Sequence, residues 1–174
     1  MPLVKRPGFG IDFVGSGFSG LVDYNDSATS VTPIDLTAGT WTELTNDGLG
    51  PFTNTTYATD KYPILSGTGK LDISNVPLGS FLIIRPDYTI TPSSNNASLE
   101  FRYTLGTGGS AYTLEKNEGR LDLGAGIPYR RALEAHFIYV GDTNTKDNPI
   151  TLQVKLSSAG SVVNAGLAVG TVLA

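Results

Sequence analysis

The sequence predicts an all-β protein, a β-sandwich or a barrel, on three observations. Hydrophobic and polar residues alternate with a period of two in several segments, which is the pattern of strands with one face covered and the other in water. Clusters of Gly, Asn, Asp, Ser and Pro separate these segments at short intervals. Helical periodicity is almost absent, and no fixed repeat indicates a solenoid or a propeller. About eight to ten short strands joined by such turns are typical of a sandwich or a barrel.

Three segments predict the longest strands. Residues 99–105 (LEFRYTL) place Leu, Phe, Tyr and Leu on one face and Glu, Arg and Thr on the other. Residues 150–158 (ITLQVKLSS) repeat that alternation. Residues 81–90 (FLIIRPDYTI) are denser in apolar side chains, so we expect a strand that is covered on both faces and is bent or at an edge where Pro86 lies.

The remaining strands are shorter, and turn residues mark their ends. We expect them, in chain order, at 40–45, 69–73, 111–116, 136–140 and 162–173, with loops at 46–48, 92–97, 106–110 and 141–148. Residues 129–137 (YRRALEAHF) are the one helix-like window. They lack an N-cap residue and run into a β-branched, aromatic segment, so we expect strand there as well.

Residues 1–28 differ from the rest of the chain and predict an extended arm. Closely spaced glycines disfavour regular structure there, yet Phe9, Phe13 and Phe18 are interleaved with them. Each phenylalanine gains about 1.5–3 kcal/mol when it is covered, so the segment favours an arm that orders against a partner. The alternative is that it folds back onto its own domain. We therefore divide the chain into an anchoring arm, 1–28, and a globular domain, 29–174.

The same arm contains a glycine motif that is typical of dinucleotide-binding enzymes. Gly15, Gly17 and Gly20 have the G-x-G-x-x-G spacing. That turn needs a helix that opens at the third glycine, because the helix N-terminus holds the pyrophosphate. Residues 21–33 (LVDYNDSATSVTP) have no helical periodicity. We therefore predict no nucleotide site.

The sequence offers few residues for catalysis or metal binding. It has no cysteine, and His136 is its single histidine, which excludes thiolate catalysis, histidine-based triads and multi-histidine metal sites within one chain. We expect His136 to be an ordinary strand residue. Asp142, Asn144 and Asp147 could offer oxygen ligands to calcium, but an Asx-rich turn explains them without a metal. We predict no enzyme, cofactor or metal; His136 and the Asp142/Asp147 pair are the groups to test should turnover be found.

The composition also narrows the partners. Hydrophobic residues make up 40% of the chain and charged residues 16%, with a formal net charge of −4. Such a chain is not drawn to nucleic acid or anionic lipid, and its low-charge surface suits burial against neighbours. No N-terminal apolar run indicates a signal peptide, and no segment approaches the about 18 apolar residues of a membrane span. We expect a soluble protein made in the cytoplasm, without nucleic-acid or membrane partners.

Three segments taken together resemble a known family: residues 40–54 (TWTELTNDGLGPFTN), 69–109 (GKLDISNVPLGSFLIIRPDYTITPSSNNASLEFRYTLGTGG) and 137–166 (FIYVGDTNTKDNPITLQVKLSSAGSVVNAG). They are similar to small virion proteins of tailed phages, whose globular part resembles the tumour-necrosis-factor and complement-head type of jelly roll. The resemblance covers about residues 31–170 and includes no catalytic motif. It implies a jelly-roll β-sandwich that forms a homotrimer tied to a capsid or a tail. In such trimers aromatic strand residues near the three-fold axis form the subunit contacts, which implies Phe101, Tyr103 and Tyr139 here; ordinary monomer core is the alternative for each.

The expected function is therefore that of a capsid decoration or cement protein in a phage virion. The trimer would bind the assembled head, through the major capsid protein or a portal or tail protein, and Phe9, Phe13 and Phe18 would anchor the arm. The alternative is a receptor- or glycan-binding module of a head or tail fibre. Tyr62 or Tyr112 would then stack on a sugar, within a site formed by the loops 92–97, 106–110 and 141–148. The sequence encodes no coiled-coil or β-helical shaft of the kind a fibre needs.

Overall fold

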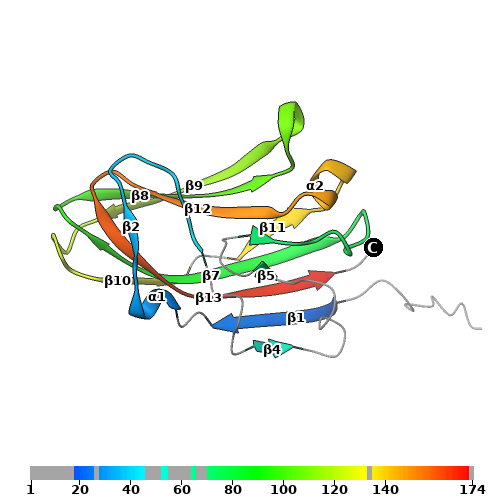
Figure 1. Cartoon of the computed structure of the whole chain (residues 1–174), viewed down its shortest axis with the longest axis horizontal. Helices are drawn as coiled ribbons and strands as arrows, with labels where there is room; N and C mark the ends of the chain where they lie inside the picture. Colours follow the sequence, from blue (N-terminus) through cyan, green and yellow to red (C-terminus); the bar gives the residue numbers. More distant parts are fainter. Residues whose placement is uncertain are drawn as a thin grey trace, which may run out of the picture.

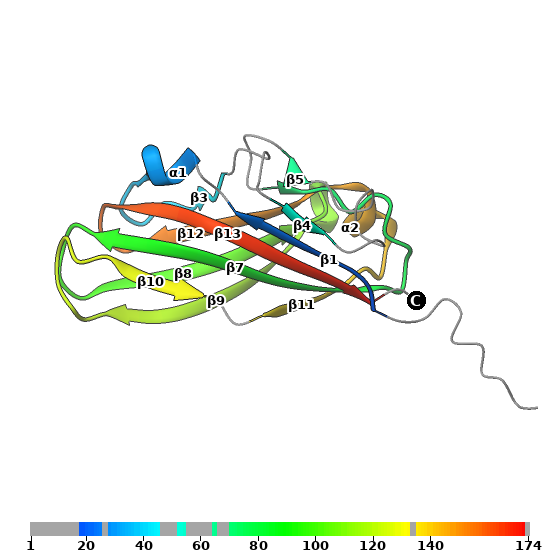
Figure 2. The same cartoon turned by 90° about the horizontal axis from the view of Figure 1, so that it is seen from below.

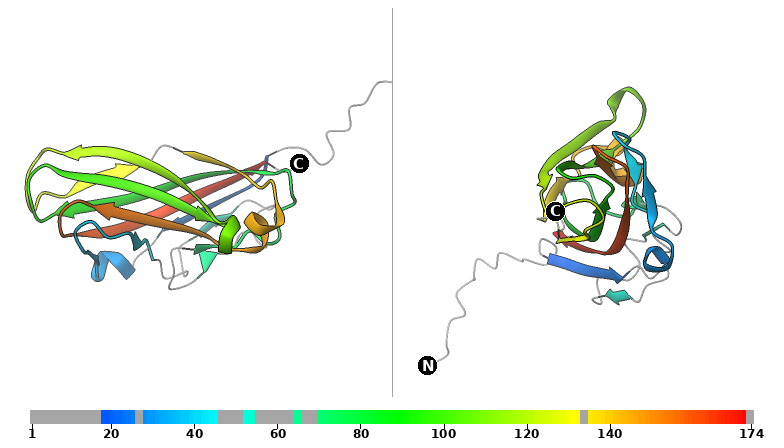
Figure 3. Two further views of the ribbon diagram at one scale, coloured as in Figure 1. Left: turned by 90° about the horizontal axis from the view of Figure 1, so that it is seen from above. Right: turned by 90° about the vertical axis from the view of Figure 1, so that its left-hand side faces the viewer.

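The alternating segments form the strands of two antiparallel sheets that pack against each other (Figure 1). The computed structural model describes residues 18–25, 28–45, 52–54, 64–65, 70–132 and 135–172. Strands account for 53% of the structure. Seen along the long axis, the two sheets wrap around one shared interior (Figure 3). The prediction of an all-β sandwich is confirmed at this level.

Sheet A, the larger of the two, has seven strands. Their order is β10-β7-β13-β1-β4, and β11 also pairs with β7 and β2 with β13. Residues 129–132 and 136–137 of the helix-like window lie in β10 and β11, so the expectation of strand is confirmed for these residues. The bounds in sheet A are β1 (Phe18–Asn25), β2 (Ile34–Leu36), β4 (Phe52–Asn54), β7 (Phe81–Pro92), β10 (Tyr129–Ala132), β11 (His136–Tyr139) and β13 (Gly160–Val172).

Sheet B has six strands in the order β5-β6-β12-β8-β9, with β3 also pairing with β12. β8 and β9 form a hairpin, and its connection includes the short 3₁₀ helix η1 (Gly108–Ser110) within the predicted loop 106–110. The bounds in sheet B are β3 (Thr42–Glu43), β5 (Ile64–Leu65), β6 (Lys70–Leu71), β8 (Ala97–Leu105), β9 (Tyr112–Leu121) and β12 (Ile150–Leu156).

Part of the predicted arm belongs to sheet A. Residues 18–25 form β1, which pairs with β13 from Phe18 opposite Val172 to Asn25 opposite Gly166. On its other side β1 pairs with β4. The boundary that we predicted at residue 28 therefore falls after a strand that is hydrogen-bonded on both sides. Phe18 is the first residue of that strand, and Phe9 and Phe13 lie outside the described residues.

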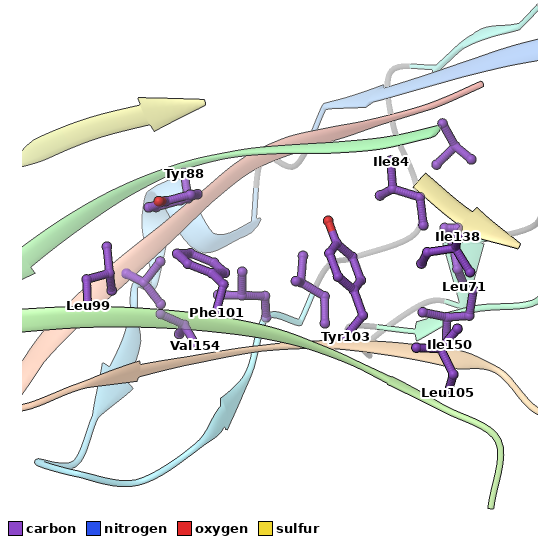
Figure 4. Packing of buried hydrophobic residues seen from close by; sticks show 14 of the residues in the cluster. Leu71, Ile84, Tyr88, Leu99, Phe101, Tyr103, Leu105, Ile138, Ile150 and Val154 are labelled. Carbon is purple, nitrogen blue, oxygen red and sulfur yellow. The ribbon is translucent and has the colours of Figure 1, made fainter. Parts of the chain in front are cut away.

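The core lies between the sheets and follows the predicted alternation. Every second residue is buried along β8 and along β12. The largest fully buried side chains among the described residues are Tyr88, Tyr103 and Phe101. The ring centroids of Tyr88, from sheet A, and Phe101, from sheet B, lie 4.4 Å apart, and Figure 4 shows the two side chains facing each other across the interior. These contacts join the two layers into one core.

β7 differs from its prediction in one respect. Its inward residues are buried, but Phe81 and Arg85 on the outer face are exposed, so the expectation of a strand covered on both faces is wrong. Pro86 pairs in register with Leu167 of β13 and lies between the segments of β7 that pair with β11, up to Ile84, and with β10, from Asp87.

The outer face of sheet B is polar and densely paired. The guanidinium carbon of Arg102 lies 4.3 Å from the centre of the Trp41 ring, and Lys155 Nζ lies 4.6 Å from it. Arg102 Nε donates a hydrogen bond of 2.7 Å to Gln153 Oε1, and Lys155 Nζ lies 2.8 Å from Glu100 Oε2. Trp41 is thus covered by cations that are themselves paired, which suits a face that stays in water.

Two short helices complete the described fold. α1 (Ala28–Val31) is fixed to β13, because the buried Thr29 hydroxyl accepts from Asn164 N at 2.9 Å and donates to Asn164 O at 3.0 Å. These bonds lie where the register of β13 shifts against β7. α2 (Thr143–Asp147) lies within the predicted loop 141–148. No helix among the described residues is long and apolar enough to cross a membrane.

Candidate functional site

Two of the three residues expected at a trimer contact belong to the core. Phe101 and Tyr103 are each 1% exposed and point between the sheets (Figure 4). A side chain that its own sandwich already covers has no surface to offer a second subunit, so this expectation is corrected for both. Tyr139 is different, because 53% of it is exposed on β11. Its role in a trimer stays a prediction.

His136, the single histidine, lies on the inner side of β11. It pairs in register with the buried Ile84, and its ring centroid lies 5.1 Å from that of Tyr103. Within the described part of the chain, no group of three or more His, Asp or Glu residues is placed to hold a metal ion. The structure therefore brings His136 together with an aromatic core residue rather than with the Asp142/Asp147 pair.

Tyr103 is the one residue in this region with a strongly perturbed acidity. Burial, and secondarily the negative charge of Glu118, raise the pKa of its phenol above the ordinary value of 10.0. Its hydroxyl has no hydrogen-bond partner among the described residues. The folded state thus keeps the phenol neutral where the unfolded chain would ionise it. The contribution of this phenol to the free energy of unfolding is therefore fully present below pH 10.0 and falls as the pH rises above that value.

Replacing Tyr103 by Phe is therefore expected to leave the free energy of unfolding near neutral pH unchanged or slightly raised, since no hydrogen bond is lost and a buried unpaired hydroxyl is removed. Above pH 10.0 the variant is expected to lose less stability than the wild type. Urea denaturation near neutral pH and above pH 10.0 measures both effects.

Tyr129→Phe is the matched control. The Tyr129 hydroxyl accepts hydrogen bonds from the backbone N–H groups of Leu123 and Gly124. Its removal is expected to cost about 1 kcal/mol near neutral pH. Equal losses for the two variants would mean that the Tyr103 hydroxyl is also bonded.

Two of the three loops proposed for a glycan site lie together. Asn144, in α2, accepts a hydrogen bond from Thr107 N and donates one to Thr107 O, each at 3.2 Å. These bonds join loop 141–148 to loop 106–110. Loop 92–97 lies at the other end of β8, about 25–30 Å away along the strand. There the Asn95 side chain accepts from Ala125 N instead.

The aromatic residues proposed for sugar stacking are only partly placed. Tyr112 is 40% exposed at the start of β9, and its hydroxyl lies 3.5 Å from Thr145 Oγ1. It therefore borders the joined loops. Tyr62 lies outside the described residues.

The oxygen atoms proposed for calcium have protein partners. Asp142 caps α2, with Oδ1 accepting from Thr145 N at 2.8 Å and Oδ2 accepting from Thr145 Oγ1 at 3.1 Å. Asn144 Oδ1 is bonded to Thr107, and Asp147 Oδ1 lies 3.4 Å from Lys146 Nζ. Helix capping and loop bracing account for these side chains. Calcium binding there remains a hypothesis from the sequence.

Sequence reasoning named Tyr139 but missed the exposed aromatic cluster on sheet A to which it belongs. Phe81, Phe137 and Tyr139, here called the aromatic strip, are 45%, 68% and 53% exposed. Phe81 pairs in register with Tyr139, and their ring centroids lie 5.0 Å apart. Period two places Phe137 and Tyr139 on one face of residues 136–140, but both faces are apolar, so the pattern does not mark that face as exposed. For Phe81 the apolar density of its strand hid the exposure.

β11 and the start of β7, which carry the aromatic strip, lie at the end of sheet A where β1 begins and β13 ends (Figure 2). Across the strands, Phe18 pairs with Val172, Val172 with Phe81, and Phe81 with Tyr139. Three strand spacings separate the first position from the last, or about 15 Å. β1 therefore begins near the aromatic strip.

No family model matches this chain, and neither does any curated protein.

Proposed function

We propose that this chain is a structural protein of a phage virion, a trimeric jelly-roll module that decorates the assembled head and stabilises it. The observation that carries the proposal is the aromatic strip. Three large aromatic side chains exposed side by side are typical of a surface that another molecule covers. The polar, paired outer face of sheet B is what remains in water.

The strand order supports the jelly-roll part of the proposal. In sheet A the late strand β13 lies between the early strand β1 and the middle strand β7. In sheet B the late strand β12 lies between β6 and β8 in the same way. Successive strands alternate between the sheets at β7 to β8, β9 to β10 and β12 to β13. Late strands inserted in both sheets are what two interlocked Greek keys produce.

Stabilisation of the head would follow from linkage. A protein that binds the assembled shell, and not its free subunits, shifts the equilibrium toward the shell by mass action. In a trimer, one bound N-terminal segment raises the effective concentration of the other two at neighbouring sites. Phe9 and Phe13 are the anchors that we propose for this segment, on the major capsid protein or on a portal or tail protein.

The test is removal of residues 1–17, because β1 begins at Phe18 and every described strand is kept. The shortened chain is expected to fold and to lose at least about 100-fold in affinity for heads that lack the protein, as loss of several tethered contacts implies. Co-sedimentation with such heads measures the binding. Undiminished binding would contradict anchoring by this segment.

A second candidate is a glycan-binding module of a head or tail fibre. The observation in its favour is the junction of loops 106–110 and 141–148 beside the half-exposed Tyr112. A glycan array separates the two candidates. Saturable binding to one sugar class that Tyr112→Ala abolishes would favour the fibre module, whereas no binding to any sugar favours the decoration protein.

A further inference from the structure

Sheet B has one long edge strand among the described residues, and it is β9. β9 ends the strand order, has ten residues and pairs with β8 alone among the described strands (Figure 1). The other edge strands of the two sheets, β2, β3, β4, β5, β10 and β11, have two to four residues each. A long edge presents a row of backbone N–H and C=O groups with which a strand of another molecule can pair, whereas a short edge offers few. β9 is therefore the edge at which copies of this chain would most readily join into a larger sheet.

The inward positions of β9 differ from those of the neighbouring strands. The buried residues of β8 and β12 are all apolar or aromatic. In β9, however, Lys116 pairs in register with the buried Phe101, and residues directly opposite each other in an antiparallel pair share a face. The Lys116 side chain is 27% exposed, and its Nζ lies 3.0 Å from Glu118 Oε1. An ion pair thus lies at the inner margin of the sheet, where the neighbouring strands place apolar side chains.

A β-bulge directs Glu118 to this inner margin. Its two neighbours in the chain, Asn117 and Gly119, pair with consecutive residues of β8, so Glu118 has no partner across the ladder. The φ of Gly119 is +89°, which glycine adopts without strain, and Gly119 N donates to Asn117 Oδ1 at 2.7 Å. The Glu118 side chain is only 15% exposed, and its charge contributes to the raised pKa of Tyr103 between the sheets. The bulge therefore turns a carboxylate inward.

Stability does not explain this ion pair. Only 16% of the residues are charged, so two inward charges on one strand are not the by-product of a highly charged chain. Charges taken out of water lose hydration, and apolar residues of similar volume in their place are often as stabilising or more so. Glu118 Oε1 is buried and accepts no hydrogen bond among the described residues, although Lys116 Nζ is close. The pair therefore calls for another role.

The two charges oppose the pairing of a further strand with β9. Such a strand would extend the sheet and remove the water that Lys116 and Glu118 still contact, which costs free energy. Apolar side chains at the same positions would instead gain from being covered. We infer that Lys116 and Glu118, together with the bulge, keep the β9 edge from pairing with a strand of another copy of this chain. Inward charges and bulges protect the edges of many β-sheet proteins in this way. The inference concerns the edge alone and requires neither a trimer nor a virion.

The test replaces both charges by apolar side chains, in the full-length double variant Lys116→Met/Glu118→Leu. Sedimentation velocity over a wide concentration range is expected to show species larger than those of the wild type, with a dissociation constant at least about tenfold lower. In these species the backbone N–H groups of residues 112–121 are expected to exchange hydrogen more slowly, because an added strand bonds to β9. In dilute protein the melting temperature is expected to equal that of the wild type or to exceed it.

Glu115→Leu/Arg120→Met is the matched control. Glu115 and Arg120 also lie in β9 and carry one charge of each sign, but their side chains are 52% and 61% exposed. They pair with Arg102 and Ser98, which alternate with the buried residues of β8, and so they lie on the outer face. This control exposes more new apolar surface than the test variant and keeps the inward ion pair. We expect residues 112–121 to exchange hydrogen in it as they do in the wild type.

Larger species with slowed exchange at residues 112–121 in the test variant alone would support the inference. It is overturned if the test variant sediments as the wild type does, if exchange is slowed only elsewhere, or if the control associates to the same extent. Should the apolar variant not fold, Lys116→Gln/Glu118→Gln removes the charges and keeps polar side chains. It is expected to associate more strongly than the wild type, and equal association would overturn the inference. The mass of the wild type and its binding to phage heads bear on the proposed function alone.

Discussion

Phe101→Ala is expected to lower the free energy of unfolding by about 3–5 kcal/mol, the range for a fully buried aromatic side chain. Phe101 is 1% exposed, in the middle of β8, with Val154 of β12 beside it in register and the Tyr88 ring 4.4 Å away in the other sheet. Its removal leaves a cavity where the two sheets meet. Since domains are stable by about 5–15 kcal/mol, urea denaturation will resolve this loss readily.

Phe137→Ala is the matched control for the loss at Phe101. It deletes the same atoms from a side chain that is 68% exposed. Measured in dilute protein, where copies do not associate, it is expected to cost less than about 1 kcal/mol. Equal losses for the two variants would contradict the assignment of Phe101 to the core and of Phe137 to the surface.

The fold was predictable where a strand has one wet face. Residues 99–105 and 150–156 alternate strictly, and they became β8 and β12 with every second residue buried. The sequence also excluded helix over 129–137, because no N-cap residue precedes a segment that runs into β-branched and aromatic residues. Strands of this kind are determined by residues close together in the chain, so they can be predicted from the sequence alone.

The sequence could not tell which covered face belongs to the core and which to an interface. Period two shows that Phe101 and Tyr103 share a face, but a neighbouring sheet and a neighbouring subunit select the same apolar residues. In residues 136–140 both faces are apolar, so the pattern is ambiguous until the sheets are placed. Only tertiary packing assigns Ile138 to the interior, at 1% exposure, and Phe137 to the surface.

Long-range polar contacts were equally hidden. Asn144 joins two loops through Thr107, which is 37 residues away. Thr29 satisfies the backbone of Asn164 across 135 residues. Each side chain is of a type that turns and helix ends also favour. The residues next to Asn144 and Thr29 in the sequence do not indicate that either side chain binds a distant segment.

Gly160→Ala is expected to lower the free energy of unfolding by about 1–3 kcal/mol, the usual cost of overpacking. Gly160 begins β13 with a strand on each side, paired with Leu36 of β2 and with Pro92 of β7. An added Cβ would lie 2.5 Å from Thr91 O, 2.8 Å from Leu156 Cδ2 and 3.2 Å from Pro92 Cα. Two of these atoms belong to the backbone, so relief requires β13 and β7 to separate.

Gly109→Ala tests whether space is the cause of that loss. No atom lies within 4 Å of a Cβ added at Gly109 in η1, so this variant is expected to stay within about 0.5 kcal/mol of the wild type. Thermal and urea denaturation of the pair measure the difference. If the two variants have the same free energy of unfolding, then β13 and β7 do not approach at Gly160 as closely as their register requires. The pairing of the last strand with the middle of sheet A would then need revision, and with it the strand order that supports a jelly roll.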